Sequence, residues 1–458
     1  MVTIKSINAK IISYSLLVLF LLGSATFYGQ NTVISSNNTS YTVTSSNKKG
    51  VRTYKVKNSK SNFQVEYEGE ITLSDDDKDV IGVSRGGFIE IKKTSFGSKR
   101  RILIHAESGK LVKKYYVGWS EKGFAPAGKE WLAEILPKIL RSTTIAAASR
   151  VDRFYKKGGT NAVLAEVRKM DSDYVQAAYI KLLLEKSLST NDLVGVLQAT
   201  GKNIKSDYYI SQILKSNQKA FFKNDKTVSA YIKTTSGLKS SHYMTQILKS
   251  LIKDTSISDN QLDEMLEITK SLKSDHYLTQ ILTELMNTRT LNSTNINKLL
   301  EISEQLKSDH YRTQVLQKAL KSNKLSKSGY DSFLGSLKNI KSDHYSSTII
   351  MDLLDQNLDD KELSKVLGIL TVNVKSDFYA GKIFKKMAQN KQLSDKQIVI
   401  LLQAISKNIK SSYTLSSVLV SYADRVKKGS QQVRDAYLSV AKKISSDTYY
   451  GKVMKAIN

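Results

Sequence analysis

Four of the five histidines in this chain recur at one spacing, and a tyrosine follows each of them. Successive members are 34 residues apart: His242, His276, His310 and His344. Imidazole nitrogens bind zinc and exchange protons near neutral pH, so such a row could form a metal site or a protonation-sensitive surface.

Spacing argues against a shared metal and favours aromatic packing. Equivalent positions in neighbouring helical hairpins are separated by roughly 8–10 Å, whereas each ligand of a zinc ion lies about 2 Å from the metal. Tyr174, Tyr208 and Phe378 fill the same position in other copies of the sequence pattern. We therefore predict that these rings pack together, with protonation-sensitive behaviour as the alternative.

A lysine stands three residues before each of these histidines and recurs with the same period. The series is Lys205, Lys239, Lys273, Lys307, Lys341, Lys375 and Lys410. If the copies stack, their ammonium groups form a basic stripe able to follow a long polyanion. The alternative is a row of solvated turn residues, five of them partly balanced by an aspartate two positions later. The lysine and histidine positions together are the candidate binding stripe.

The aspartates form a third row, which could be mistaken for catalytic carboxylates: Asp173, Asp207, Asp275, Asp309, Asp343, Asp377 and Asp447. Each begins a predicted helix, where a short acidic side chain can cap the free backbone N–H groups, so we predict capping. A separate acidic run at residues 75–79 could bind calcium, but its spacing matches no calcium loop, and we predict a solvated turn. We predict no catalytic residue, cofactor or metal site.

These rows belong to one repeated sequence, which is clearest at residues 272–282. Copies begin at Met170, Ile204, Leu238, Leu272, Leu306, Ile340, Val374, Ile409 and Ile444, in six steps of 34 residues and two of 35. Apolar spacing within a copy predicts a helix from Ser274 or Asp275 to about Met286, a turn, and a second helix through Ile296 to Leu306. Residues 170–458 are therefore predicted to form an α-hairpin solenoid of about nine repeats, and the fold class to be mainly α.

A small antiparallel β domain is predicted before the repeats. Residues 51–120 alternate apolar and polar side chains between turn signals, which indicates about five to seven strands. Residues 121–169 form a helical connector, in which Trp131, Leu132 and Ile135 recur at helical spacing and are suited to cover one face of the sheet. Residues 31–50, rich in Asn, Ser and Thr, are predicted to be a flexible lead-in.

The first 30 residues are typical of an export signal, because a basic flank precedes an apolar run of twelve residues, Ile11 to Leu22, and then small residues. A retained N-terminal membrane anchor is the alternative. The formal charge of +28 predicts anionic partners, and an exported address argues against nucleic acid as the main one. Cysteine is absent, which excludes disulfides and thiolate chemistry.

The 34-residue hairpin is similar in length to the tetratricopeptide repeat but lacks its Trp, Leu-Gly and Pro marks. Four segments carry a closer resemblance: residues 67–71 (YEGEI), 84–91 (SRGGFIEI), 131–137 (WLAEILP), and Arg150-Val151. With the Ser-Asp helix starts, residues 63–458 resemble exported regions of Bacteroidota-type bacteria, some joined to membrane sensors of the β-lactam-receptor and metallopeptidase type. No His-Glu-x-x-His site is present, so the resemblance implies no peptidase activity.

Two hypotheses follow. The preferred one is an exported, non-enzymatic scaffold whose solenoid surface binds a protein or an anionic polymer of the cell envelope. The alternative is a sensor or enzyme with a pocket between the β domain and the first repeats, around His105, Trp119, Trp131 and Arg150.

Overall fold

The computed structural model describes residues 30–36, 39–45, 50–57, 62–95, 97–254, 257–322, 325, 327–356 and 358–458. These form two compact domains, a head domain up to Ala147 and a solenoid domain from Ala148 to Asn458. The predicted export segment lies outside the described residues, apart from Gln30. Among the described residues, no helix is long and apolar enough to span a bilayer.

The head domain is built on an antiparallel sheet in the strand order β1-β2-β3-β4-β7-β8-β9-β10, with β5 and β6 as a separate hairpin. Turns between successive strands keep most neighbours in chain order. The strands are β1 (Gln30–Ser36), β2 (Thr39–Ser45), β3 (Arg52–Lys57), β4 (Asn62–Glu68), β5 (Ile71–Leu73), β6 (Val80–Val83), β7 (Phe88–Ser95), β8 (Ser98–Glu107), β9 (Lys110–Val117) and β10 (Ser120–Lys122). The predicted antiparallel β domain is confirmed.

Residues 31–50, predicted to be a flexible lead-in, contain most of strand β1 and all of strand β2. Strands β1 and β2 pair with each other, and β2 pairs with β3 through Tyr41 opposite Val56. The low content of large apolar residues suggested a flexible segment. However, alternating threonine and valine residues favour extended backbone, and an existing sheet edge provides hydrogen-bond partners.

One face of the sheet is covered by α1 (Lys129–Ser142), which follows the short π-helix η1 (Phe124–Gly128). Val65, Ile91 and Ile104 from the sheet share one buried cluster with Trp131 and Leu132 of α1. Burial of each large apolar side chain contributes about 1.5–3 kcal/mol. The first part of the predicted connector, α1, therefore completes the core of the head domain, as the apolar spacing predicted, whereas its second part belongs to the solenoid domain.

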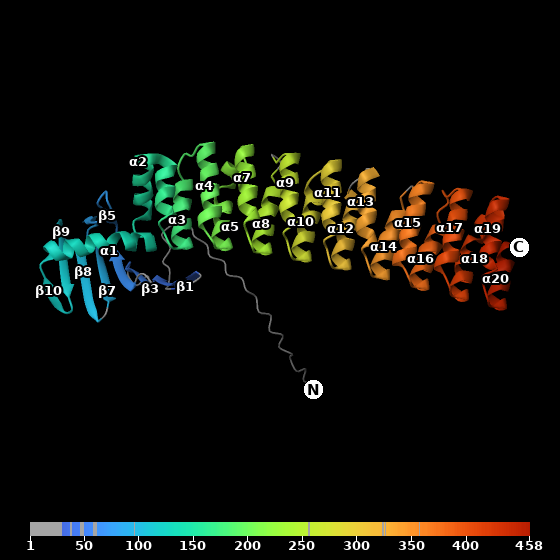
Figure 1. Cartoon of the computed structure of the whole chain (residues 1–458), viewed down its shortest axis with the longest axis horizontal. Coiled ribbons are helices and arrows are strands. Elements are labelled where there is room, and N and C mark those ends of the chain that lie inside the picture. The colour runs from blue at the N-terminus through green and yellow to red at the C-terminus, as the bar shows by residue number, and fades with distance from the viewer. Residues whose placement is uncertain are drawn as a thin grey trace, which may run out of the picture. The chain divides into compact units, whose positions relative to one another are not determined.

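The solenoid domain opens with α2 (Ala147–Val167), which is kinked at Gly158 and Gly159, and continues as two layers of helices (Figure 1). The first helices of the repeats form one layer: α3 (Asp173–Leu184), α5 (Asp207–Ser216), α8 (Ser241–Ile252), α10 (Asp275–Thr288), α12 (Asp309–Ser322), α14 (Asp343–Leu354), α16 (Asp377–Ala388), α18 (Ser412–Lys428) and α20 (Asp447–Ile457). The second helices form the other: α4 (Thr190–Asn203), α7 (Asp225–Ser236), α9 (Asp259–Thr269), α11 (Ser293–Ser303), α13 (Lys327–Lys338), α15 (Asp360–Asn373), α17 (Asp395–Asn408) and α19 (Gln431–Ala441). A one-turn helix, α6 (Gln218–Phe221), lies in the second repeat.

Each helix packs against the equivalent helix of the next repeat. Helix α10 contacts α8 and α12, and α11 contacts α9 and α13. Ile281, Leu282 and Leu285 of α10 are fully buried between these neighbours. A single hairpin would leave these apolar side chains exposed to water. The stability of the domain therefore comes from the stacking of neighbouring hairpins, as in other α-hairpin arrays. The mainly α solenoid predicted from the 34-residue period is confirmed.

Candidate functional site

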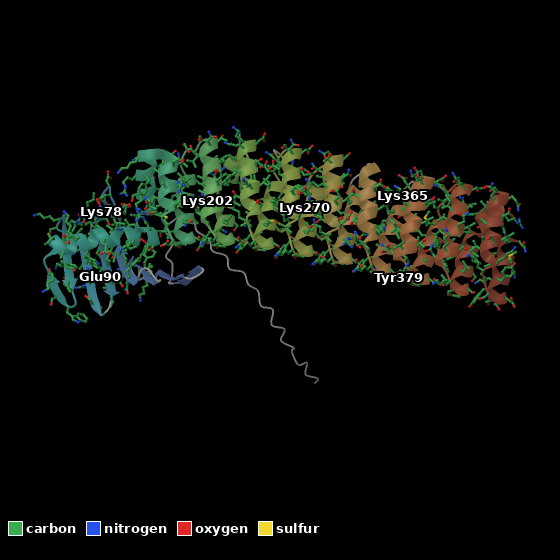
Figure 2. The ribbon with its side chains drawn as sticks, in the orientation of Figure 1. Lys78, Glu90, Lys202, Lys270, Lys365 and Tyr379 are labelled. Atoms are coloured by element: carbon green, nitrogen blue, oxygen red, sulfur yellow. The ribbon has the colours of Figure 1, made fainter. Side chains whose placement is uncertain are left out.

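The candidate site is the edge of the solenoid where the first helix of each repeat begins. We number the repeats 1 to 9 from Met170 and the positions within each from its first residue, so that Lys273 to Tyr277 occupy positions 2 to 6 of repeat 4. The lysine–aromatic edge comprises the position-2 lysines of repeats 2 to 8 together with the rings at positions 5 and 6. Figure 2 marks one of these rings, Tyr379 on α16, and Lys365 on α15 in the other layer.

The aspartates at position 4 join successive repeats. Asp275 Oδ2 accepts hydrogen bonds from the backbone N–H groups of Lys307, at 2.8 Å, and Ser308, at 2.7 Å, in the next repeat. The same pair of bonds is formed by Asp173, Asp207, Asp275, Asp309, Asp343 and Asp377, with distances of 2.8–3.1 Å to the lysine nitrogen and 2.5–2.7 Å to the serine nitrogen. We call this arrangement the aspartate latch.

The prediction that these aspartates cap their own helices was therefore wrong for the six that form the latch. Ser274 occupies the N-cap of α10, and Asp275 is the first helical residue. The Asp275 carboxylate bonds to the backbone of the neighbouring repeat and not to the first turn of its own helix. Its negative charge still lies at the favourable, positive end of the helix dipole.

Serine replaces the aspartate in two repeats, and the hydrogen bonding changes there. Ser241 and Ser412 begin α8 and α18, and in those helices the preceding N-cap hydroxyls of Ser240 and Ser411 cap their own helices. Ser412 Oγ accepts a bond from the next repeat's backbone N–H at Ser445, 3.2 Å away. A hydroxyl thus takes over part of the latch at this junction.

Aromatic rings run along the edge in an alternating series. The ring centre of His276 lies 5.3 Å from that of Tyr277 in its own repeat and 6.0 Å from that of Tyr311 in the next. The contact between position 5 and the following position 6 joins six pairs of repeats: Tyr174–Tyr209, Tyr208–Tyr243, His242–Tyr277, His276–Tyr311, His310–Tyr345 and His344–Tyr379. Thr414 occupies position 6 of repeat 8, and a further pair, Tyr413–Tyr449, follows.

Hydrogen bonds fix the orientation of three histidine rings. Nε2 of His276 lies 2.9 Å from the side-chain amide nitrogen of Gln280, and Nδ1 lies 3.4 Å from the Tyr311 hydroxyl. His242 and His310 have the same pair of partners. Both ring nitrogens therefore have partners, and within the described ranges no group of three metal-binding side chains occurs. The structure brings the histidines into an aromatic series and not into a ligand set.

The position-5 rings and the lysines are available to a ligand. Phe378 is 61 % exposed, Tyr413 65 % and Tyr208 41 %, whereas the position-6 tyrosines are half-buried. All seven lysines of the edge are exposed. Within the part of the chain that the structure describes, none of their ammonium groups pairs with a carboxylate, because the nearby aspartates bond to backbone N–H groups. Among the described residues, repeats 2 to 8 thus each offer one lysine without a carboxylate partner and, three positions later, one exposed ring.

The acidic run at residues 75–79 forms a hydrogen-bonded turn between β5 and β6. Asp76 accepts bonds from the Ser74 hydroxyl, at 2.7 Å, and from the backbone N–H of Lys78. The Ser74 bond, followed by the Lys78 bond, lowers the pKa of Asp76. Asp79 forms an ion pair with Lys113 at 2.6 Å. These carboxylates stabilise the turn by bonding within the head domain.

The four residues of the alternative pocket have separate surroundings. In the head domain, His105 lies 3.3 Å from Glu107, Trp131 is a core residue, and Trp119 is 91 % exposed. Arg150 is buried inside the solenoid domain, where it forms a 2.8 Å ion pair with Glu166. It also donates to the Tyr179 hydroxyl. Trp131 and Arg150 therefore serve packing within their own domains.

Comparisons with known proteins add little to this geometry. No family model matches the chain, and no curated protein matches it. A solved structure entitled "Computational Design of Self-Assembling Cyclic Protein Homooligomers" is 11 % identical, with a TM-score of 0.12, over 65 % of this chain and 97 % of that one.

Proposed function

We propose that this chain is an exported, non-enzymatic scaffold that binds an extended anionic polymer of the cell envelope along the lysine–aromatic edge. The observation that carries the proposal is the row of exposed lysines, repeated through the stacked hairpins, each with an exposed ring three positions later and with no carboxylate partner among the described residues. The net charge of +28 gives additional attraction to any polyanion.

The rings favour a polymer that itself contains rings, such as an acidic polysaccharide. Aromatic faces bind planar or ring-shaped units by stacking, and neighbouring cations neutralise acidic groups. Stacked repeats place equivalent groups roughly 8–10 Å apart. A linear polymer can therefore meet several copies of the same contact, and the contacts add through effective concentration.

The export part of the proposal rests on residues 1–30, with their basic flank and apolar run, and on the resemblance to exported Bacteroidota-type regions. Mass spectrometry of the chain recovered from an envelope fraction tests it. A mature N-terminus after Ala25 or near Gln30 is expected. A full-length chain in the cytosolic fraction would contradict export.

The binding test uses heparin as a ring-containing polyanion and polyglutamate as a ring-free one. We expect the triple substitution Lys273→Ser, Lys307→Ser and Lys341→Ser to weaken binding to both. A matched control removes three exposed lysines from the opposite ends of the hairpins, Lys226, Lys361 and Lys391. The control should retain most of the affinity, and equal losses in both variants would reject the edge as the site.

The aromatic contribution is tested separately with Phe378→Ser and Tyr413→Ser. Both side chains are exposed, so the substitutions leave the core unchanged. Heparin binding should weaken several-fold, while polyglutamate binding stays the same. A protein captured from an envelope fraction and retained at high salt would instead favour a protein partner on the solenoid surface.

A further inference from the structure

A second surface lies in the head domain, at the turn between β9 and β10. Trp119 occupies this turn and is 91 % exposed, and Val117 just before it is 38 % exposed. The chain contains two tryptophans, and the other, Trp131, is buried in the core. An indole this exposed lies on a protruding turn and not in a cleft.

Cations lie on one side of this turn, on strands β8 and β7. The Lys99 ammonium lies 4.8 Å from the centre of the Trp119 ring. Arg100 pairs in register with Val117 on one side and with Lys93 on the other. Lys99 and Arg100 are exposed and Lys93 is half-buried. Strand β10 is an edge strand of the sheet, so within the described part of the chain no further strand pairs with it (Figure 1).

Glu134 of α1 is a carboxylate whose pKa two of these cations lower. The hydrogen bond from Lys138 is the main cause of the lower pKa of Glu134, and the charges of Lys93 and Arg100 lower this pKa further. Because Glu134 already forms an ion pair with Lys138 at 2.9 Å, it offsets the charge of the turn only in part.

We propose that this turn, the Trp119 tip, contacts a bilayer surface that contains anionic lipids. Trp119 enters the interfacial layer, where indole rings prefer to lie because one edge is polar and the body is apolar. Lys99 and Arg100 bind headgroup phosphates beside it. A protruding indole with adjacent cations suits a flat, soft, anionic surface better than a single soluble ligand, which needs a concave site.

The Trp119 tip is independent of the lysine–aromatic edge, since the two surfaces belong to different domains. Failure of the polymer proposal therefore leaves the membrane proposal intact, and the reverse is also true.

Tryptophan fluorescence of the full chain tests the proposal directly. The probes are vesicles of phosphatidylcholine alone and of phosphatidylcholine mixed with phosphatidylglycerol, with nitroxide-labelled lipid added as a quencher. With anionic vesicles, the emission should shift to shorter wavelength and be quenched by the nitroxide. Trp119→Phe should abolish both changes, because Trp131 is buried and reports only on the head-domain fold.

Charge variants test whether the cations beside Trp119, and not lysines elsewhere on the head domain, contribute to membrane binding. Lys99→Ser with Arg100→Ser keeps the reporter and should raise the lipid concentration needed by about 25-fold, from about fivefold for each basic residue near an anionic surface. The control, Lys78→Ser with Lys110→Ser, removes two exposed lysines from other turns of the head domain and should leave the curve unchanged. An unchanged curve for the first variant, absence of nitroxide quenching, or an equal spectral change with heparin alone would overturn the proposal.

Discussion

The aspartate latch between repeats 4 and 5 can be removed by one substitution, Asp275→Ala. Its Oδ2 accepts both the Lys307 and Ser308 N–H groups, so the change deletes two bonds to a charged acceptor. The side chain is not part of the apolar core, and alanine is a good helix former. The loss should therefore be confined to the junction of the two repeats.

The expected cost follows from the surroundings of the two donors. A hydrogen bond to a charged group contributes about 1.5–3 kcal/mol. The Lys307 N–H is in an exposed bond, so water replaces the carboxylate there at small cost, whereas the Ser308 N–H is half-buried. Loss of a negative charge at the helix start adds about 0.3–1 kcal/mol. We expect a total destabilisation of about 2–3 kcal/mol.

Long repeat arrays need not unfold in a single step, so the measurement should be local. Hydrogen exchange of the Lys307 and Ser308 amides should accelerate by about 30-fold or more, which corresponds to 2 kcal/mol at about 1.4 kcal/mol per factor of ten. Asp447→Ala is a matched control, because Asp447 also begins a helix, and no later repeat follows it in the described chain. The control should show only the small helix-dipole effect.

The reverse substitution, which adds an aspartate, tests the same reasoning through a gain in stability. Ser241 stands where repeat 3 lacks the aspartate, so Ser241→Asp should create a latch to the backbone of Lys273 and Ser274. Slower exchange of those two amides and a stability gain of about 1 kcal/mol are expected. If Asp275→Ala costs no more than Asp447→Ala and Ser241→Asp gains nothing, the latch does not stabilise the array.

Three further outcomes follow from other parts of the structure. Arg150→Met should destabilise the chain by about 3 kcal/mol in thermal unfolding, the low end of the range for breaking a buried pair, because Glu166 loses its guanidinium but keeps its ion pair with Lys169 at 3.3 Å. Glu166→Gln added to it should recover part of the loss. The Ser189 hydroxyl bond is the main cause that lowers the pKa of Asp192 below its usual 3.8, so this carboxylate stabilises the fold above that pH and loses its effect as the pH falls through the lowered pKa. The stability difference from Asp192→Asn should accordingly shrink in acid, and a constant difference would contradict the assignment. Gly195 lies within α4 with open space around the position of a Cβ, so Gly195→Ala should gain about 0.5–1 kcal/mol in chemical unfolding, and a loss would contradict the open site.

The architecture could be predicted from the sequence because the repeat length and the spacing of apolar residues specify it. The 34-residue step and the apolar spacing within repeat 4 predicted two helices close to those observed as α10 and α11. The strands of the head domain could be predicted from alternation, and the helix that covers them from the spacing of Trp131 and Leu132.

The latch and the ring pairing could not be predicted in the same way. A side chain at a helix start can bond within its own helix or to a neighbour, and only the packed position of the next repeat decides between these. The recurrence of Asp275 one repeat before Lys307 was a signal, as was the tyrosine after each histidine. Neither specified that position 5 meets position 6 of the following repeat, because that contact depends on the offset between stacked helices.

The most direct test of the proposed function is amine modification of the full chain with and without heparin, read at each lysine by mass spectrometry. The account predicts protection of the seven position-2 lysines of repeats 2 to 8, with Lys226, Lys361 and Lys391 modified equally in both conditions. Uniform protection over the whole surface, or protection confined to lysines away from the edge, would contradict it.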